Sequence, residues 1–284
     1  MTTCTAETTS RAGSERIGSS HIHLQAPDPI PEEHHYIDYS GLVRRVIDAV
    51  RDDDPSLPPL AVCISGPPGS GKTAAVWAAA QALRKNCYTT QGATDCSAQD
   101  LVVFPVPTVA RTFDAVASGI CTATIAGSIG LYDEIGKVAL HSPESLTPLA
   151  SLLDDRRMLW SDFLKQPIPA SPGFAFIATK QDDEPLPFYV AQRVLTFHAA
   201  LPPPEIVLEI VRKRFPRAPS MLSEAMREWV SGRRGLSARD ACLVMHFAYR
   251  RARAGGHFIS GANGAMRCIE EAAQAAALTG GGKA

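Results

Sequence analysis

The sequence predicts an α/β fold: a parallel sheet sandwiched between helices, followed by a small all-α domain. Three observations predict it. Short β-branched apolar runs alternate with helix-forming runs over the first two thirds of the chain, and a glycine-rich turn joins one such run to a helix. After Pro202 the pattern is helical throughout, with proline and glycine between the segments. We expect a flexible leader over 1–35, an α/β core over 36–201 and a helical domain over 202–284.

Composition places the chain among ordinary soluble globular proteins, with 45% apolar and 20% charged residues. No apolar run is long enough for a membrane span, and Met1 to Ser20 lacks the apolar stretch of a secretory signal, so we expect a cytoplasmic location. The net charge of −1 gives no support for nucleic-acid binding. However, the part from Pro203 onward holds 13 Lys and Arg against 7 Asp and Glu. Its arginine clusters leave contact with nucleic acid as an alternative.

The seven cysteines are scattered and form no C-x-x-C pair, which predicts buried thiols rather than disulfides or zinc ligands. The Pro-rich leader contains His21, His23 and the adjacent pair His34 and His35, and metal binding is not favoured there over a solvated chain. The leader has no sustained periodicity, and ordered structure is expected from about Tyr36. A helix should follow Ser40, because the next apolar residues fall on one helical face.

The glycine-rich turn matches G-x-x-x-x-G-K-[S/T], with a β-branched strand before it and a helix over Ala74 to Arg84 after it. Its glycines let backbone N–H groups approach phosphate oxygens, and the helix adds its positive dipole end. Lys72 is expected to reach the β and γ phosphates of ATP, and the Thr73 hydroxyl to hold Mg²⁺. The predicted phosphate-binding residues are Gly66, Pro67, Pro68, Gly69, Ser70, Gly71, Lys72 and Thr73.

A second strand is expected over Cys87 to Thr90, and then a helix that starts at Ser97 with Asp100 three residues later. Farther on, Ser128 to Glu134 reads as a buried strand that ends in two adjacent carboxylates. At the sheet edge that carries the phosphate-binding loop, Asp133 could hold Mg²⁺ and Glu134 could accept a proton from the attacking water. The pair therefore favours hydrolysis over binding alone; the alternative is two surface acids that cap the next helix.

GPPGSGKT, IGLYDE, LTPLASLLDDRRMLW and GFAFIATKQ occur in that order. This order resembles AAA+ ATPases and is most similar to the MoxR and dynein/midasin-related branch, from about Tyr36 to Arg253. The resemblance implies ATP binding and hydrolysis with Mg²⁺, with the nucleotide between core and lid. It also implies self-assembly into a ring, as a hexamer, and a partner protein that bears a von Willebrand factor A domain.

The resemblance carries further roles to single residues. The strand over Phe174 to Thr179 would lie between the two nucleotide motifs and end in the sensor 1 region. Relatives usually place Asn where Gln181 stands here, so Gln181 and Thr179 both remain candidates to orient the attacking water.

Two arginines also match functional positions of the family. Arg193 matches the arginine finger, which a neighbouring subunit would supply to stabilise the developing charge; a solvated arginine before a strand is the alternative. Arg239 matches sensor 2. Independently, Ser237 and Asp240 form a capping box that places Arg239 in the first turn of a helix. A cation there is opposed by the positive end of the helix dipole, and a nearby anion would offset that repulsion. Leu152 to Arg157 is either a subunit contact or a solvated helix end.

We therefore expect a ring-forming ATPase module that remodels a partner protein, as a MoxR-like chaperone. A slow-hydrolysing, nucleotide-dependent switch or scaffold is the alternative. A small-molecule kinase is disfavoured by the Asp133-Glu134 pair and the helical lid. The sequence contains no N-K-x-D guanine signature, which favours adenine, but it leaves the client protein undetermined.

Overall fold

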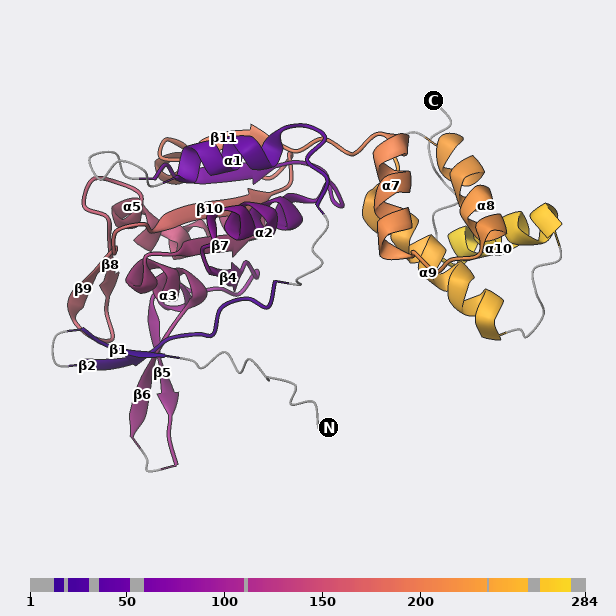
Figure 1. Ribbon diagram of the computed structural model, residues 1–284. Helices are drawn as coiled ribbons and strands as arrows, with labels where there is room; N and C mark the ends of the chain where they lie inside the picture. The colour runs from indigo at the N-terminus through magenta and orange to yellow at the C-terminus, as the bar shows by residue number, and fades with distance from the viewer. Residues whose placement is uncertain are drawn as a thin grey trace, which may run out of the picture. The chain divides into compact units, whose positions relative to one another are not determined.

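The computed structural model describes residues 13–17, 20–30, 36–51, 59–109, 112–233, 235–254 and 261–276 (Figure 1). They divide into two compact units. The first unit comprises Met1–Pro31, Val43–Ser65 and Val76–Phe197; the second comprises Glu32–Leu42, Gly66–Ala75 and His198–Ala284. The phosphate-binding loop thus groups with the C-terminal helices, whereas the sequence suggested a boundary near residue 201.

The first unit is built on a five-stranded sheet flanked by helices, which confirms the predicted fold class (Figure 1). The strand order is β11-β3-β10-β7-β4, and the pairs β3–β10, β10–β7 and β7–β4 are parallel. Strand β10 therefore lies between the strands that precede the two predicted nucleotide motifs. These strands are β3 (Val62–Ser65), β4 (Cys87–Gln91), β7 (Ile129–Asp133), β10 (Ala175–Lys180) and β11 (Leu195–His198).

Helices cover the sheet because its central strands are apolar on both faces. Helix α3 packs against β4 and β7, and α4 packs against β10. Six of the eight residues of α3 are buried, and the Ser118 hydroxyl caps it by accepting from the Cys121 N–H at 3.0 Å. The helices up to β11 are α1 (Leu42–Val50), α2 (Lys72–Leu83), α3 (Gly119–Ala126), α4 (Ile135–His141), α5 (Pro148–Leu152) and α6 (Phe188–Ala191).

A second sheet corrects the expected flexible leader. Its order is β1-β2-β6-β5, made by β1 (Ser14–Ile17), β2 (Ser20–His23), β5 (Val103–Pro107) and β6 (Phe113–Ala117). Ile22 is fully buried, and Asp28 accepts a hydrogen bond from the Thr89 N–H at 3.2 Å. Residues 13–17 and 20–30 are held because they bury apolar surface and bond to β4. The rest of the predicted leader, including His34 and His35, lies outside the described residues.

The helix expected after Ser97 is only a 3₁₀ turn, η1 (Ala98–Leu101). The capping residues behave as predicted, since Asp100 accepts from the Ser97 N–H at 2.7 Å. The turn ends because β-branched residues and two prolines, Pro105 and Pro107, follow and pair in the β5–β6 hairpin.

In the segment from Leu152 to Arg157, Leu152 ends α5 and the other residues form a turn before the hairpin of β8 (Met158–Ser161) and β9 (Gln166–Pro169). An ion pair joins Arg156 to Asp154 at 2.6 Å and holds the pKa of that carboxyl below its usual value. Arg157 donates to the Phe174 carbonyl at 2.9 Å. A second 3₁₀ turn, η2 (Pro143–Leu146), precedes α5.

Four helices form the bulk of the second unit, as the sequence predicted: α7 (Pro204–Arg214), α8 (Ser220–Ser231), α9 (Ala238–Ala254) and α10 (Gly261–Ala275). They pack around a core of their own. Among its buried residues are Val207, Met226, Trp229, Met245 and Ile269. No helix in the described part of the chain is long and apolar enough to cross a membrane.

The cysteines within the described ranges carry free thiols, as predicted, and most of them are buried. Burial raises the pKa of Cys63 to about 11 and that of Cys121 to about 12, so both thiols stay protonated at neutral pH. No group of three or more His, Cys, Asp or Glu residues that could bind a metal ion occurs in the described ranges.

Candidate functional site

The phosphate-binding loop starts directly after Ser65, the last residue of β3, and ends at Lys72, the first residue of α2. Because Ser65 pairs with Lys180, the loop leaves the sheet at the carboxyl edge of β3 and β10. The Lys72 ammonium donates to the carbonyls of Gly66 at 2.7 Å and Pro67 at 3.0 Å. The cation therefore lies over the start of the loop, and Thr73 follows it in the first helical turn.

The backbone of the loop takes conformations that favour glycine. Gly69 and Gly71 have φ of +77° and +88°, in the left-handed region. The buried hydroxyl of Ser70 has no hydrogen-bond partner among the described residues. Since a buried polar atom normally has a partner, an oxygen-rich ligand such as a triphosphate fits this loop.

The start of α9 lies against the loop within the second unit. A Cβ built on Gly69 would lie 2.5 Å from the Ser237 Cβ and 3.7 Å from the Arg239 Cβ. Ser237 and Asp240 form the predicted capping box, with Ser237 Oγ donating to the Asp240 carboxylate at 2.8 Å and accepting from the Asp240 N–H at 3.1 Å. The exposed Arg239 is thus in the first turn of α9, beside the loop.

Sequence reasoning missed Tyr36, which also lies beside the loop. A Cβ built on Gly71 would be 3.3 Å from the Tyr36 ring, and burial followed by the charge of Asp38 raises the pKa of its hydroxyl. Tyr39 donates to the Ala200 carbonyl. The two tyrosines, Tyr36 and Tyr39, stand out in the sequence ahead of the first helix. Their contacts could not be predicted, however, because the partners Gly71 and Ala200 are 35 and 161 residues away in the chain.

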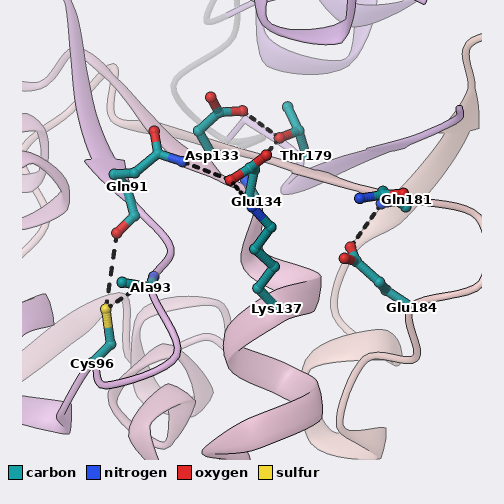
Figure 2. A network of polar contacts seen from close by, with 9 residues as sticks. All are labelled: Gln91, Ala93, Cys96, Asp133, Glu134, Lys137, Thr179, Gln181 and Glu184. Carbon is teal, nitrogen blue, oxygen red and sulfur yellow. Dashed lines mark hydrogen bonds and ion pairs between the residues drawn. The ribbon is translucent and has the colours of Figure 1, made fainter. Parts of the chain in front are cut away.

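The carboxylates at the end of β7 are organised by the neighbouring strand. The fully buried Thr179 of β10 donates its hydroxyl proton to Asp133 Oδ1 and accepts a hydrogen bond from the Glu134 N–H at 2.9 Å (Figure 2). One threonine hydroxyl therefore fixes the side chain of Asp133 and the backbone of Glu134.

Glu134 has φ of +59°, an uncommon conformation for a residue other than glycine. Its Oε2 accepts hydrogen bonds from Lys137 Nζ at 2.5 Å and Gln91 Nε2 at 3.1 Å (Figure 2). Neither donor was predicted from the sequence. Lys137 lies three residues on, a contact distance in a helix, whereas Gln91 arrives only through the register that pairs it with Asp133.

Gln181 lies apart from this group in Figure 2. Its backbone N–H donates to Glu184 Oε2 at 2.8 Å, and Lys180 Nζ binds the carbonyls of Gln181 and Glu184 at 2.9 and 2.8 Å. Of the two residues that the sequence left as alternatives, only Thr179 hydrogen-bonds to the Asp133 and Glu134 pair in the described part of the chain.

Arg193 follows α6, as expected for a residue just before β11. Its guanidinium donates to the Tyr189 carbonyl. Within the described ranges, no hydrogen bond or ion pair joins Arg193 to Asp133 or Glu134.

The residues present fit a magnesium ion. Mg²⁺ prefers hard oxygen ligands, and the Asp133 carboxylate is a partly buried oxygen donor held in place by Thr179. The Thr73 hydroxyl, in the first turn of α2 in the second unit, is also a hard oxygen donor. Neither residue type would select a softer metal.

Comparison with known proteins gives a consistent result. Residues 61–190 match the AAA domain, dynein-related subfamily. A single-substitution variant of Thermotoga maritima RuvB shares 14% identity and a TM-score of 0.58 over 83% of this chain and 70% of that chain. RuvB described as a Holliday junction branch migration motor, from the same organism, shares 16% identity and a TM-score of 0.55 over the same fractions.

No curated protein sequence matches the chain. At these identities the likeness to RuvB establishes the fold alone, while the family match covers the loop, β7 and β10 together. Residues 61–190 thus match the dynein-related AAA domain, and the chain shares its fold with RuvB.

Proposed function

We propose that the chain binds ATP with Mg²⁺ and hydrolyses it, with Glu134 as the general base. The observation that supports this most strongly is the Asp133-Glu134 pair at the end of β7, held by Thr179 in an AAA domain that carries a complete phosphate-binding loop. A site for binding alone would have no use for a second, individually fixed carboxylate.

In the proposed reaction, a water oxygen attacks the γ phosphorus and passes a proton to the Glu134 carboxylate. The bond from the γ phosphorus to the β–γ bridging oxygen breaks, and ADP takes up the electron pair. Lys72 and the backbone N–H groups of Gly69 to Thr73 hold the β and γ oxygens. Mg²⁺, bound by Thr73 and Asp133, would neutralise charge on those oxygens.

Three further roles are proposed from the same residues. Arg239 contacts the γ phosphate, which its place beside Gly69 supports. Thr179 takes the sensor 1 role, because it hydrogen-bonds to the acidic pair and Gln181 does not. Arg193 completes the site of a neighbouring subunit in a ring, a hexamer by resemblance, since within its own chain it joins neither Asp133 nor Glu134.

The ring would use hydrolysis to remodel a client protein, as MoxR-like chaperones do, with a von Willebrand factor A domain protein as partner. RuvB is a branch migration motor on Holliday junctions. A net charge of −1 does not support the same substrate here.

A second candidate is a slow-hydrolysing switch or scaffold. It is favoured by Gln181, which stands where relatives place the asparagine that orients water. The printed sequence has the longer glutamine there, and its backbone N–H donates to Glu184 Oε2. The two functions differ in rate rather than in ligand.

Steady-state phosphate release from ATP tests the proposal. We expect turnover that requires Mg²⁺, disappears with excess chelator, and rises with protein concentration as subunits assemble. A protein that binds ATP but shows no phosphate release at any concentration would favour the switch. Absence of ATP binding would contradict both functions.

Replacement of Thr179 by valine should lower kcat about 100-fold, because the isosteric side chain leaves Asp133 and the Glu134 N–H without their partner. The loss of two partly buried hydrogen bonds should also lower the free energy of unfolding by about 1–3 kcal/mol. Kinetics and chemical denaturation measure the two effects. Gln181→Leu is the matched comparison and should change kcat by less than about threefold; the reverse order would assign the sensor role to Gln181.

A further inference from the structure

Lys137, which no motif marks, contacts the proposed base more closely than any other cation in the described part of the chain. It lies in the first turn of α4, three residues after Glu134, and the two side chains are 41% and 43% exposed. Its Nζ lies 2.5 Å from Glu134 Oε2. Hydrogen bonding to that carboxylate raises the pKa of Lys137, so the ammonium form persists across the physiological range.

Two donors from different elements converge on one oxygen. Gln91 at the end of β4 and Lys137 on α4 both reach Glu134 Oε2 (Figure 2). The backbone of Glu134 is fixed separately, by Thr179. Together the three contacts hold one residue at both its backbone and its carboxylate, and only Oε1 remains for a proton from water.

The surroundings of Lys137 are acidic. A Cβ at Gly136 would lie 2.1 Å from Glu184 Oε2, which places that carboxylate against the first turn of α4. The charges of Glu184 and Asp133 act on Lys137 in the same direction as Glu134 does. Without the ammonium, three carboxylates would repel one another around the base.

We propose that Lys137 is a positioning residue for hydrolysis: with Gln91 it holds the Glu134 carboxylate through Oε2 and so presents Oε1 to the attacking water. This inference rests on the proposed function. An ordinary exposed ion pair between Lys137 and Glu134 would contribute only about 0–1 kcal/mol to stability and nothing to catalysis. A positioning contact acts on kcat, since a base displaced by about 1 Å can lose up to about 100-fold in rate.

The test compares Lys137→Met, which removes the charge at similar length, with Lys137→Arg, which keeps it. We expect Lys137→Met to lower kcat about tenfold with KM for ATP within twofold of wild type, and Lys137→Arg to restore at least half of the wild-type kcat. Lys213→Met is the matched control, since Lys213 forms an exposed helical ion pair with Glu209 at 3.1 Å with a similar 45% exposure of its lysine. That control should leave kcat unchanged.

A double-mutant measurement shows through which residue Lys137 acts. In a Glu134→Gln background, Lys137→Met should cause no further fall in the residual rate, because the carboxylate that it positions has gone. Equal additional falls in both backgrounds, or a wild-type kcat for Lys137→Met, would overturn the inference while the proposed function stands. A wild-type protein without turnover would overturn the proposed function, and the inference with it.

Discussion

Glu134→Gln is expected to bind ATP like the wild type and to hydrolyse it about 10²–10⁴-fold more slowly, the usual contribution of a general base. The glutamine amide can still accept from Lys137 and Gln91 through its oxygen, so the local fold should be kept, but it cannot take a proton from water. Binding of a fluorescent ATP analogue and single-turnover hydrolysis measure the two properties separately.

A matched control for this variant is available nearby. Glu184 also carries its carboxylate close to α4 and accepts from the Gln181 N–H at 2.8 Å, yet it has no proposed chemical role. Glu184→Gln should therefore retain turnover within about threefold of wild type, in keeping with the change of one partly buried hydrogen bond. Full turnover in Glu134→Gln would reject Glu134 as the base.

Arg193→Ala is expected to lower kcat about 10³-fold, because a guanidinium that meets the transferring phosphoryl group stabilises charge that exists only in the transition state. ATP affinity and melting temperature should change little, since the arginine donates to a carbonyl of its own chain, that of Tyr189, a contact of modest net stability. Arg156→Ala serves as the control: that arginine pairs with Asp154 at 2.6 Å on the same unit.

Mixing the two inactive variants tests whether Arg193 acts on a neighbour. A site with Glu134 from an Arg193→Ala subunit and Arg193 from a Glu134→Gln subunit is complete, so mixed assemblies should regain a measurable fraction of wild-type turnover. The regain should follow subunit exchange and fail at dilutions that dissociate the assembly. No recovery in assemblies shown to be mixed would place the action of Arg193 within its own chain.

Much of the fold could be predicted because the relevant patterns are local. The strand before the loop and the strand that ends at Asp133 are continuous apolar runs, and the helices after Pro202 are separated by proline and glycine. The spacing of apolar residues and the positions of these helix-breaking residues were therefore sufficient to predict the strands and helices. The prediction failed after Ser97, where a correct capping box closed only a single turn. Capping residues stabilise a helix start, but the β-branched residues and prolines that follow decide its length.

The N-terminal segment, in contrast, is ordered although its own sequence did not predict order. Nothing within residues 13–30 has a helical or sustained strand period, so no local rule predicts order there. The described part is ordered because of two distant contacts. Ile22 of β2 pairs with Ala115 of β6, and Asp28 accepts a hydrogen bond from Thr89, 61 residues farther along the chain. Order in such a segment depends on contacts that only tertiary structure creates.

By itself, the sequence determined which chemical groups this protein carries: a loop suited to a triphosphate, a paired aspartate and glutamate after a buried strand, and two arginines at spaced positions. Only the tertiary structure decided how they are held. It selected Thr179 over Gln181 as the residue bound to the acidic pair, and brought Gln91 and Lys137 to one oxygen of Glu134. The reason is physical: residue types follow from local pattern, whereas hydrogen bonds between β4, β7 and β10 depend on strand order and register, which no single segment specifies.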